Sequence, residues 1–245
     1  MPEELGFTIQ NLINIKKTVF GDLEIFTGRW NESSAKGVEI YLSLAWSGWG
    51  KVSSARAATR LISIKHNKIP VEALFFTGVA GAISSELSQW DIVIPNQLIQ
   101  HDMDARPLYE RFVIPALKTD KILIEKNILF WTLKTLKNAK QVGILNDFGT
   151  IHEGLVATGD CFISDQKVVK KLKDDIDDLL AVEMEGASVA QVAKQEKIPF
   201  QIVRIVSDGA NESSREDFSQ FLRKYNQKSA IIISQLVNNL NMAPF

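Results

Sequence analysis

The stretch that most constrains the fold is Leu179–Ser188, in which a short apolar strand passes directly into a helix. Leu179–Val182 has the composition of a buried strand, and Gly186–Glu196 carries apolar residues at helical spacing. Two acids, Glu183 and Glu185, lie at the junction. Because ligands bind at the carboxyl ends of the strands in open α/β sheets, the pair predicts a site for hydroxyl groups or a developing cation. The alternative is that a helix dipole stabilises two acids that hold no ligand.

The composition favours one large core and excludes several classes of protein. The chain has 245 residues, of which 45% are hydrophobic. Its net charge of -1 gives no electrostatic basis for binding nucleic acid. Cys161 is the single cysteine, so an internal disulfide cannot form. No apolar run reaches the roughly 18 residues of a membrane span and no signal pattern is present, so we expect a cytoplasmic protein without nucleic-acid or membrane partners.

Apolar runs and turn residues alternate along the chain in the manner of an α/β protein. Strands are predicted at Leu23–Trp30, Val38–Trp46, Ala73–Thr77, Trp90–Pro95, Gly149–Thr158, Leu179–Val182 and Phe200–Ala210. Helices are predicted from Pro2 through Ile13 and at Val52–His66, Asp120–Ala139, Gly186–Glu196 and Glu216–Asn239. The acidic run Asp174–Asp178 is expected to be a solvated loop. No repeat or linker divides the chain, so we expect one domain spanning residues 1–245.

Two glycine-containing links lack the complete phosphate-binding motifs. Ser47–Lys51 has neither the first glycine nor the final hydroxyl residue of a P-loop, and Gly78–Gly81 is not a dinucleotide fingerprint. Both links can still bring backbone close to a ligand. His101, Asp102 and Asp104 are too few for a zinc site, so a hydrogen-bonded turn at a subunit contact is expected there. We therefore expect no metal and no cofactor.

Six stretches, in this order, resemble the 5'-methylthioadenosine/S-adenosylhomocysteine nucleosidases of the purine nucleoside phosphorylase superfamily. The most specific are Val182–Ala187, which reads VEMEGA, and Arg204–Asp208, which reads RIVSD. The supporting stretches are Ser47–Val52, Thr77–Gly81, Gln100–Asp104 and Thr158–Ile163. The resemblance implies a three-layer α/β/α single domain with a central twisted mixed sheet, acting as a homodimer. It also implies hydrolysis of the N-glycosidic bond of adenine thionucleosides, with release of adenine.

The resemblance assigns the two catalytic roles to acids that are far apart in sequence. Asp208 matches the acid that protonates adenine at N7, and Glu4 matches the acid that deprotonates the attacking water. These residue types suit the chemistry, because adenine leaves readily only when N7 is protonated as the bond breaks. Carboxylates near the ribose would stabilise its oxocarbenium-like transition state.

The same resemblance supplies the substrate-binding residues. They are Gly81, Phe162, Ile163, Met184, Glu185, Ser207, Glu183, Val79, Trp49, Phe218 and Arg204. Glu185 and Met184 would hold the ribose, whereas Phe162 and Ile163 would stack on and hydrogen bond the purine. Glu183 is expected to support the site near Arg204, because a buried arginine needs an acidic partner.

Two residues match the subunit contact of the family, and two other features of the sequence differ from the family pattern. Ala105 and Leu108 match positions that reach the partner subunit's site. Family members carry a strand before a Met-x-Glu-Glu opening, and the sequence begins at Met1 of that opening. Trp49 is larger than the expected aliphatic residue, which predicts a narrowed alkylthio pocket that disfavours S-adenosylhomocysteine.

Other functions remain open at this point. A phosphorylase of the same fold would need a cationic cradle, for which Lys51, Arg56, Arg60 and Arg204 are candidates. Glu4 near the ribose would repel phosphate. An aminodeoxyfutalosine nucleosidase and a non-catalytic nucleoside-binding protein are the remaining alternatives.

Overall fold

The computed structural model describes residues 2–31, 39–210 and 214–245. The helices are α1 (Pro2–Ile9), α2 (Lys51–Ile62), α3 (Lys126–Gln141), α4 (Gln166–Asp175), α5 (Gly186–Glu196) and α6 (Ser214–Asn238), followed by a 3-10 turn at Leu240–Met242. The strands are β1 (Leu12–Phe20), β2 (Leu23–Trp30), β3 (Tyr41–Ala45), β4 (Leu74–Ala82), β5 (Ile92–Gln100), β6 (Lys121–Leu123), β7 (Ile151–Thr158), β8 (Leu179–Glu183) and β9 (Phe200–Asp208).

The strands form two sheets. β1, β2 and β3 make a small antiparallel sheet, and the other six have the order β6-β5-β7-β8-β4-β9. β5 also pairs with β9, so the larger sheet closes on itself. The sheet has three parallel pairs (β4 with β9, β5 with β7, β7 with β8) and three antiparallel pairs (β5 with β6, β4 with β8, β5 with β9), so the predicted mixed sheet is confirmed.

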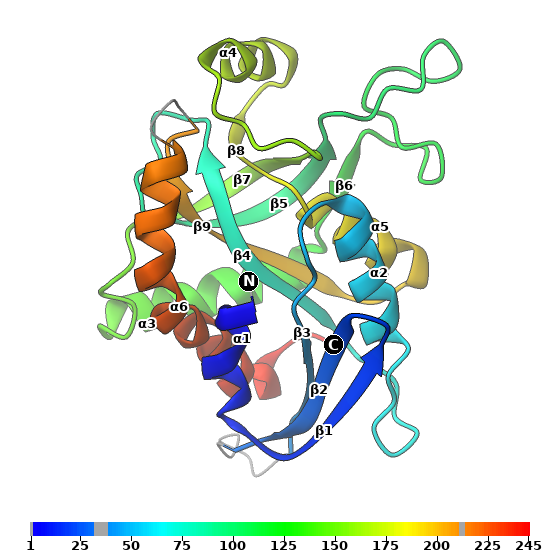
Figure 1. Cartoon of the computed structure of the whole chain (residues 1–245), viewed down its shortest axis with the longest axis vertical. Coiled ribbons are helices and arrows are strands. Elements are labelled where there is room, and N and C mark those ends of the chain that lie inside the picture. Colours follow the sequence, from blue (N-terminus) through cyan, green and yellow to red (C-terminus); the bar gives the residue numbers. More distant parts are fainter. Residues whose placement is uncertain (1, 32–38, 211–213) are drawn as a thin grey trace.

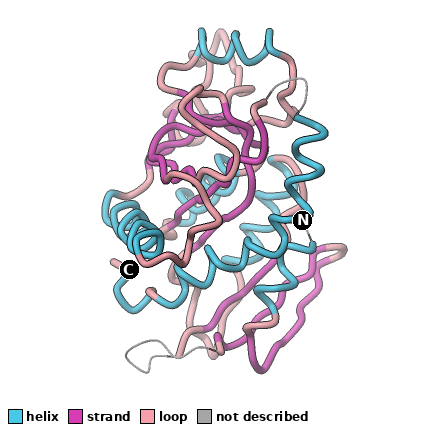
Figure 2. The backbone as a smooth tube through the Cα atoms, turned by 90° about the vertical axis from the view of Figure 1, so that its left-hand side faces the viewer, coloured by secondary structure: helices cyan, strands magenta, loops and turns pink. Residues whose placement is uncertain are grey.

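Helices cover the sheets on both sides, which confirms the α/β architecture. In Figure 1, α1, α3 and α6 lie to one side of the larger sheet and α2 and α5 to the other, with α4 at one end. The turned view in Figure 2 shows the strands of the larger sheet among these helices and the small sheet at the lower edge of the molecule. Every residue of β9 is buried, as expected of a strand covered on both faces. None of the helices in the described ranges is long and apolar enough to cross a membrane.

The predicted bounds of β2 and α5 are confirmed, but the first predicted helix is too long. α1 ends at Ile9, and Leu12 and Ile13 begin β1. The Asn11 side chain donates a hydrogen bond to the carbonyl of Phe7 at the end of that helix, at 3.1 Å. Leu12 then pairs with Trp30 across an antiparallel ladder. The helical spacing of Leu12 and Ile13 is therefore overridden by strand pairing. Pairing depends on a distant strand, and the local spacing of apolar residues carries no information about it.

Two further predictions were wrong in part. The helix expected from Asp120 begins only at Lys126, because Lys121–Leu123 pairs with β5 as the edge strand β6. The acidic run is not simply a loop, since Asp175 ends α4 and pairs with Arg111 at 2.7 Å. Ile176 follows in the core at 4% exposure. Helix α4, β1 and β6 were not foreseen at all.

Candidate active site

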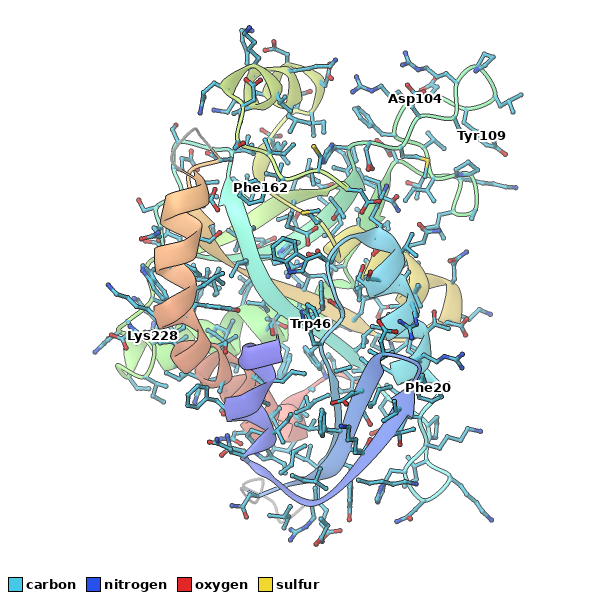
Figure 3. The ribbon with its side chains drawn as sticks, in the orientation of Figure 1. Phe20, Trp46, Asp104, Tyr109, Phe162 and Lys228 are labelled. Atoms are coloured by element: carbon cyan, nitrogen blue, oxygen red, sulfur yellow. The ribbon has the colours of Figure 1, made fainter. Side chains whose placement is uncertain are left out.

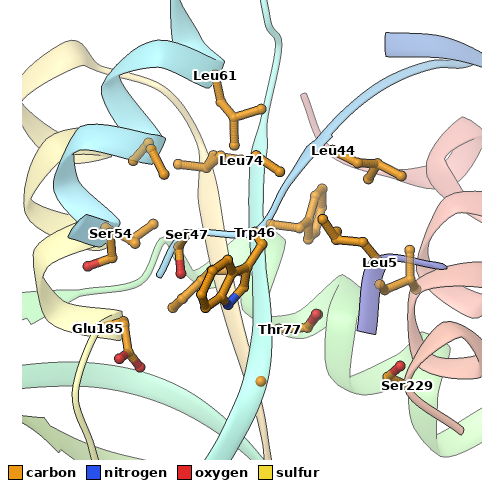
Figure 4. A pocket seen from close by; sticks show the side chains of 18 of the residues that line it. Leu5, Leu44, Trp46, Ser47, Ser54, Leu61, Leu74, Thr77, Glu185 and Ser229 are labelled. Carbon is orange, nitrogen blue, oxygen red and sulfur yellow. The ribbon is translucent and has the colours of Figure 1, made fainter. Parts of the chain in front are cut away.

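The acids singled out in the sequence line one cavity of about 570 Å³. Glu183 ends β8, Glu185 precedes α5 and Asp208 ends β9, and all three line it. Figure 4 shows Glu185 at one end of this cavity with Trp46 and Thr77 nearby. Strand ends that are distant in sequence thus bring three carboxylates to one place, as the switch-point rule predicts.

Asp208 is buried and held in a fixed position. Its Oδ2 accepts a hydrogen bond from the Ser207 hydroxyl at 2.7 Å, and its Oδ1 accepts one from the Ala210 N–H at 2.9 Å. A Cβ added to Gly81 would lie 3.3 Å from Asp208 Oδ1, so a glycine there lets β4 approach this acid closely. Only 5% of Asp208 is exposed, so the cavity is the available direction for a ligand.

Glu185 is the second carboxylate of the cavity and is tied to the glycine-rich link. Its Oε1 accepts a hydrogen bond from the Gly50 N–H at 2.8 Å, and its Oε2 lies 3.6 Å from Arg204 Nη2. Burial raises the pKa of Glu185, and the nearby Arg204 opposes that rise. The link Ser47–Lys51, which lacks the P-loop motif, therefore contributes a backbone donor to the site.

Glu183 also lines the cavity, but its carboxylate is engaged by groups of the protein itself and organises the turn. It accepts hydrogen bonds from the Gly186 N–H at 2.9 Å and 2.7 Å, from the Glu185 N–H at 3.0 Å, and from the Thr158 hydroxyl. Arg204 pairs with the same carboxylate. The expected proximity of Glu183 and Arg204 is therefore confirmed. A buried acid at the start of α5 is stabilised by these N–H groups and by the arginine.

The planar guanidinium of Arg204 is surrounded by close contacts. Its guanidinium lies 4.4 Å from the centre of the Phe76 ring, and a Cβ on Gly78 would overlap its Nη1. Its exposed fraction is 2%, and its Nε has no hydrogen-bond partner in the described residues. Gly78 is thus required by the arginine rather than by a turn.

A polar network outside the cavity connects the two loops that border it. Lys51 Nζ donates to Asp102 Oδ1 at 2.6 Å, and the Lys51 N–H donates to Asp160 Oδ1 at 2.7 Å. The Asp160 N–H donates in turn to Asp102 Oδ2 at 3.0 Å. Burial would raise the pKa of Asp102, but hydrogen bonds from Lys51 and Asp160 hold it below its ordinary value. The predicted hydrogen-bonded turn after Gln100 is present, and we name Lys51, Asp102 and Asp160 the loop latch.

The remaining predicted binding residues of the cavity come from β4, from β9 and from three connecting segments. Those that line it are Val79, Gly81, Trp49, Phe162, Ile163, Met184, Ser207 and Arg204. Trp49 and Phe162 are 56% and 44% exposed, whereas Ile163 is packed in the core. Figure 3 labels Phe162 and Trp46 beside the ribbon of β4. The aromatic and apolar lining suits a flat base with an apolar substituent.

Four predicted residues are not placed in this cavity. Glu4 belongs to α1 and Phe218 to α6, but their side chains lie outside the described residues. Ala105 and Leu108 do not line the cavity, and Leu108 is 85% exposed. Figure 3 shows their loop, marked by Asp104 and Tyr109, projecting away from the cavity. A role at a partner subunit stays a prediction.

Several residues of the site were not foreseen in their roles. Trp46, Tyr225 and Ser229 line the cavity, and Thr158 donates to Glu183 while accepting from the Ala187 N–H at 2.8 Å. Burial raises the pKa of Tyr225. Thr158 ends β7, so its place at a strand terminus was the available signal. No cluster of His, Cys, Asp and Glu suited to a metal ion occurs among residues 2–31, 39–210 and 214–245.

Comparisons with known proteins agree with this geometry. Residues 1–238 match the family model of the phosphorylase superfamily. The 5'-methylthioadenosine/S-adenosylhomocysteine nucleosidase of Geobacillus sp. is 31% identical over 98% of this chain and 96% of its own length.

Two solved structures are similar over almost the whole chain. The S-adenosylhomocysteine nucleosidase of Streptococcus pyogenes, in complex with 5-methylthiotubericidin, has a TM-score of 0.82 and 31% identity, covering 98% of this chain and 94% of that one. The futalosine hydrolase of Helicobacter pylori has a TM-score of 0.80 and 27% identity, with 97% and 94% covered. The chain therefore belongs to the phosphorylase superfamily and, within it, to the 5'-methylthioadenosine/S-adenosylhomocysteine nucleosidases.

Proposed function

We propose that this protein hydrolyses the N-glycosidic bond of 5'-methylthioadenosine and S-adenosylhomocysteine, or of 5'-deoxyadenosine, releasing adenine and the corresponding ribose. The observation that carries the proposal is the convergence of Asp208 and Glu185 on one cavity from the ends of β9 and β8. Family membership and the nucleosidase names of the relatives support the same reaction.

The proposed mechanism separates base protonation from sugar binding. Asp208 donates a proton to N7 of adenine, and the Ser207 hydroxyl keeps its carboxyl oriented. Glu185, fixed by the Gly50 N–H, accepts hydrogen bonds from the ribose hydroxyls and stabilises the developing oxocarbenium ion. Phe162 stacks on the purine and Trp49 borders the alkylthio group. Glu4 activates the attacking water from the opposite face of the sugar.

We also propose an oligomeric state, a cellular location and a metabolic role for the protein. Residues 1–245 act as one domain, and the protein acts as a homodimer in which Ala105 and Leu108 approach the partner's site. The exposed position of Leu108 supports that arrangement. A cytoplasmic location and a place in methionine salvage complete the proposal. No cofactor is required, since proton transfer and charge stabilisation come from side chains.

The test is the release of adenine from 5'-methylthioadenosine, measured with and without inorganic phosphate. We expect release without phosphate and a reducing sugar as product. Asp208→Asn and Glu4→Gln should each lower kcat by about 10²-fold or more. A strict phosphate requirement with a sugar 1-phosphate product would show that the protein is a phosphorylase.

The charges around the cavity support hydrolysis over phosphorolysis. Lys51 is bound to Asp102, and Arg56 pairs with Asp22 at 2.7 Å. Arg60 lies over the Phe20 ring, 4.7 Å from its centre. Of the four candidate cations only Arg204 lines the cavity, and it is paired with Glu183. A phosphate dianion would meet carboxylates rather than a cationic cradle.

A second candidate reaction is favoured by the similarity to the Helicobacter pylori futalosine hydrolase. The two reactions break the same kind of bond and differ in the 5' substituent. Comparing kcat/KM for 5'-methylthioadenosine and aminodeoxyfutalosine distinguishes them. Tight binding of both nucleosides without adenine release would instead identify a non-catalytic nucleoside-binding protein.

A further inference from the structure

The turn that precedes β5 lies beside the end of β9. It comprises Ser88–Asp91, and we call it the clamp turn. The Trp90 N–H donates a hydrogen bond to the Val206 carbonyl at 2.9 Å, and the Val206 N–H donates one to the Asp91 carbonyl at 2.9 Å. The clamp turn therefore holds β9 two residues before Asp208.

β9 carries an extra residue between these bonds and the acid. Ala80 and Gly81 of β4 pair with Val206 and Asp208, so Ser207 is left without a partner in the register of these two strands, both of which lie within the described residues. A bulge of this kind interrupts the ladder and re-aims a neighbouring side chain. Because Ser207 is only 1% exposed, its carbonyl needs a hydrogen-bond donor from another part of the chain.

Gln89 of the clamp turn supplies that donor. Its side-chain Nε2 donates to the Ser207 carbonyl at 2.7 Å. The Ser207 carbonyl and the Asp208 N–H belong to one planar peptide unit, so this bond fixes the plane from which the acid departs. Gln89 and Asp208 also line a second cavity, of about 230 Å³. Since space borders Asp208 in both cavities, packing alone does not fix its position.

The clamp turn is itself held in a defined conformation. Trp90 has a φ of 76°, in the left-handed region that a bulky residue rarely adopts, and its ring centre lies 4.3 Å from that of Phe221 in α6. The Asp91 N–H donates to the Ser88 carbonyl at 3.0 Å, and Asp91 Oδ2 accepts from the Ser88 N–H at 2.8 Å. Strained residues persist only where their surroundings over-determine them, and they cluster at functional sites.

We propose that Gln89 is a positioning residue for adenine release, which aims the Asp208 carboxyl at N7 of the base by binding the Ser207 carbonyl. The inference rests on the proposed function, because it assigns a role in that reaction. Gln89 does not line the cavity that holds the carboxylates, so it acts through Ser207 and Asp208 rather than on the substrate. Its loss therefore lowers kcat and leaves KM nearly unchanged.

Gln89→Met tests the role, because it removes the amide donor and keeps the length of the side chain. We expect kcat for adenine release from 5'-methylthioadenosine to fall by about tenfold or more, with KM changed by less than about twofold. Gln89 is exposed at the surface, so Tm should stay within about 4 °C of that of the unsubstituted chain. Gln141→Met, at the exposed end of α3, is the matched control and should change neither kcat nor KM.

Gln89→Glu tests the hydrogen bond itself. A carboxylate cannot donate to the Ser207 carbonyl, whereas a protonated carboxyl can. The ratio of kcat for Gln89→Glu to kcat for Gln89→Met should therefore rise by about fivefold between about pH 7 and about pH 4, as the introduced carboxyl is protonated. All other titrating groups are the same in the two variants and cancel in this ratio.

The inference is overturned if Gln89→Met keeps the kcat of the unsubstituted chain, if KM rises in place of the fall in kcat, or if the ratio does not depend on pH. A fall in Tm with kcat unchanged would show that Gln89 is only structural. An unsubstituted chain that releases no adenine would refute the proposed function, and the inference with it. An active chain with unaffected Gln89 variants refutes the inference alone, so the two failures are distinguishable.

Discussion

The Glu185 carboxylate accepts a hydrogen bond from the Gly50 N–H at 2.8 Å, across a sequence separation of 135 residues. This contact joins the start of α2 to the start of α5. It leaves the second oxygen of Glu185 toward Arg204, at 3.6 Å from Nη2. The acid that we propose to bind the sugar is therefore positioned by backbone on one side and by a buried cation on the other.

Activity should fall in acid as Glu185 is protonated. Burial places the pKa of Glu185 above its usual 4.5, so the carboxylate is lost at a higher pH than for an exposed glutamate. We expect kcat/KM for 5'-methylthioadenosine to fall as the pH drops through that raised pKa. Glu185→Gln should lower kcat/KM by about 10²-fold and remove this part of the pH profile. Glu196→Gln, at the exposed end of α5, is the control and should change neither.

Breaking the buried pair of Glu183 and Arg204 should destabilise the fold strongly. The two side chains are 1% and 2% exposed. Removing one partner leaves an uncompensated buried charge, so Arg204→Met should lower the free energy of unfolding by about 3–5 kcal/mol in urea. The double variant with Glu183→Met should lose less than the sum of the single variants. Additive losses would contradict the pairing.

Gly78→Ala should act through Arg204 rather than through the backbone of β4. The added Cβ would overlap Nη1, and the guanidinium is held between Phe76 and Glu183. We expect a loss of about 1–3 kcal/mol in unfolding free energy, together with reduced kcat. Gly6→Ala is a matched control, since nothing lies within 4 Å of its Cβ and a helix gains about 0.5–1 kcal/mol from the change. Equal effects at both glycines would exclude this explanation.

The loop latch should contribute a pH-dependent part of stability. The pKa of Asp102 is held below its ordinary value in the folded chain, so its contribution is present above the unfolded pKa of about 4 and is lost as the pH falls through the folded pKa. Asp102→Asn should therefore lower Tm at pH 6, and the difference from the unsubstituted chain should shrink in stronger acid. It should also raise KM, because the loops bearing Gly50 and Phe162 would then be joined mainly by the hydrogen bond from the Lys51 N–H to Asp160. Asp147→Asn, 62% exposed, is the control.

Trp49 should set the preference for the 5' substituent. It lines the cavity and is larger than an aliphatic side chain. Trp49→Leu should raise kcat/KM for S-adenosylhomocysteine relative to 5'-methylthioadenosine by about tenfold, the scale of small changes in an apolar pocket. An unchanged ratio would mean that Trp49 does not border the alkylthio group.

The sequence by itself determined the elements whose signals are local. β2 and α5 have the predicted bounds, because apolar runs ended by turn residues specify them without a partner. The junction between β8 and α5 was predicted to carry a site for the same reason. Glu185 and Asp208 could be paired as acids at strand ends, but the ends meet because β8 runs antiparallel to β4 and pairs with it only at Gly81 and Ala82, beside the end of β9.

Only the tertiary structure decided which contacts each of two neighbouring residues makes. Glu183 and Glu185 are two residues apart and both line the cavity, yet the Glu183 side chain is 1% exposed and is occupied by the Gly186 N–H and Arg204, whereas the Glu185 side chain is 15% exposed. Leu12 joins a strand because Trp30 lies opposite it. Each outcome depends on contacts between distant segments, and local periodicity and propensity carry no information about such contacts.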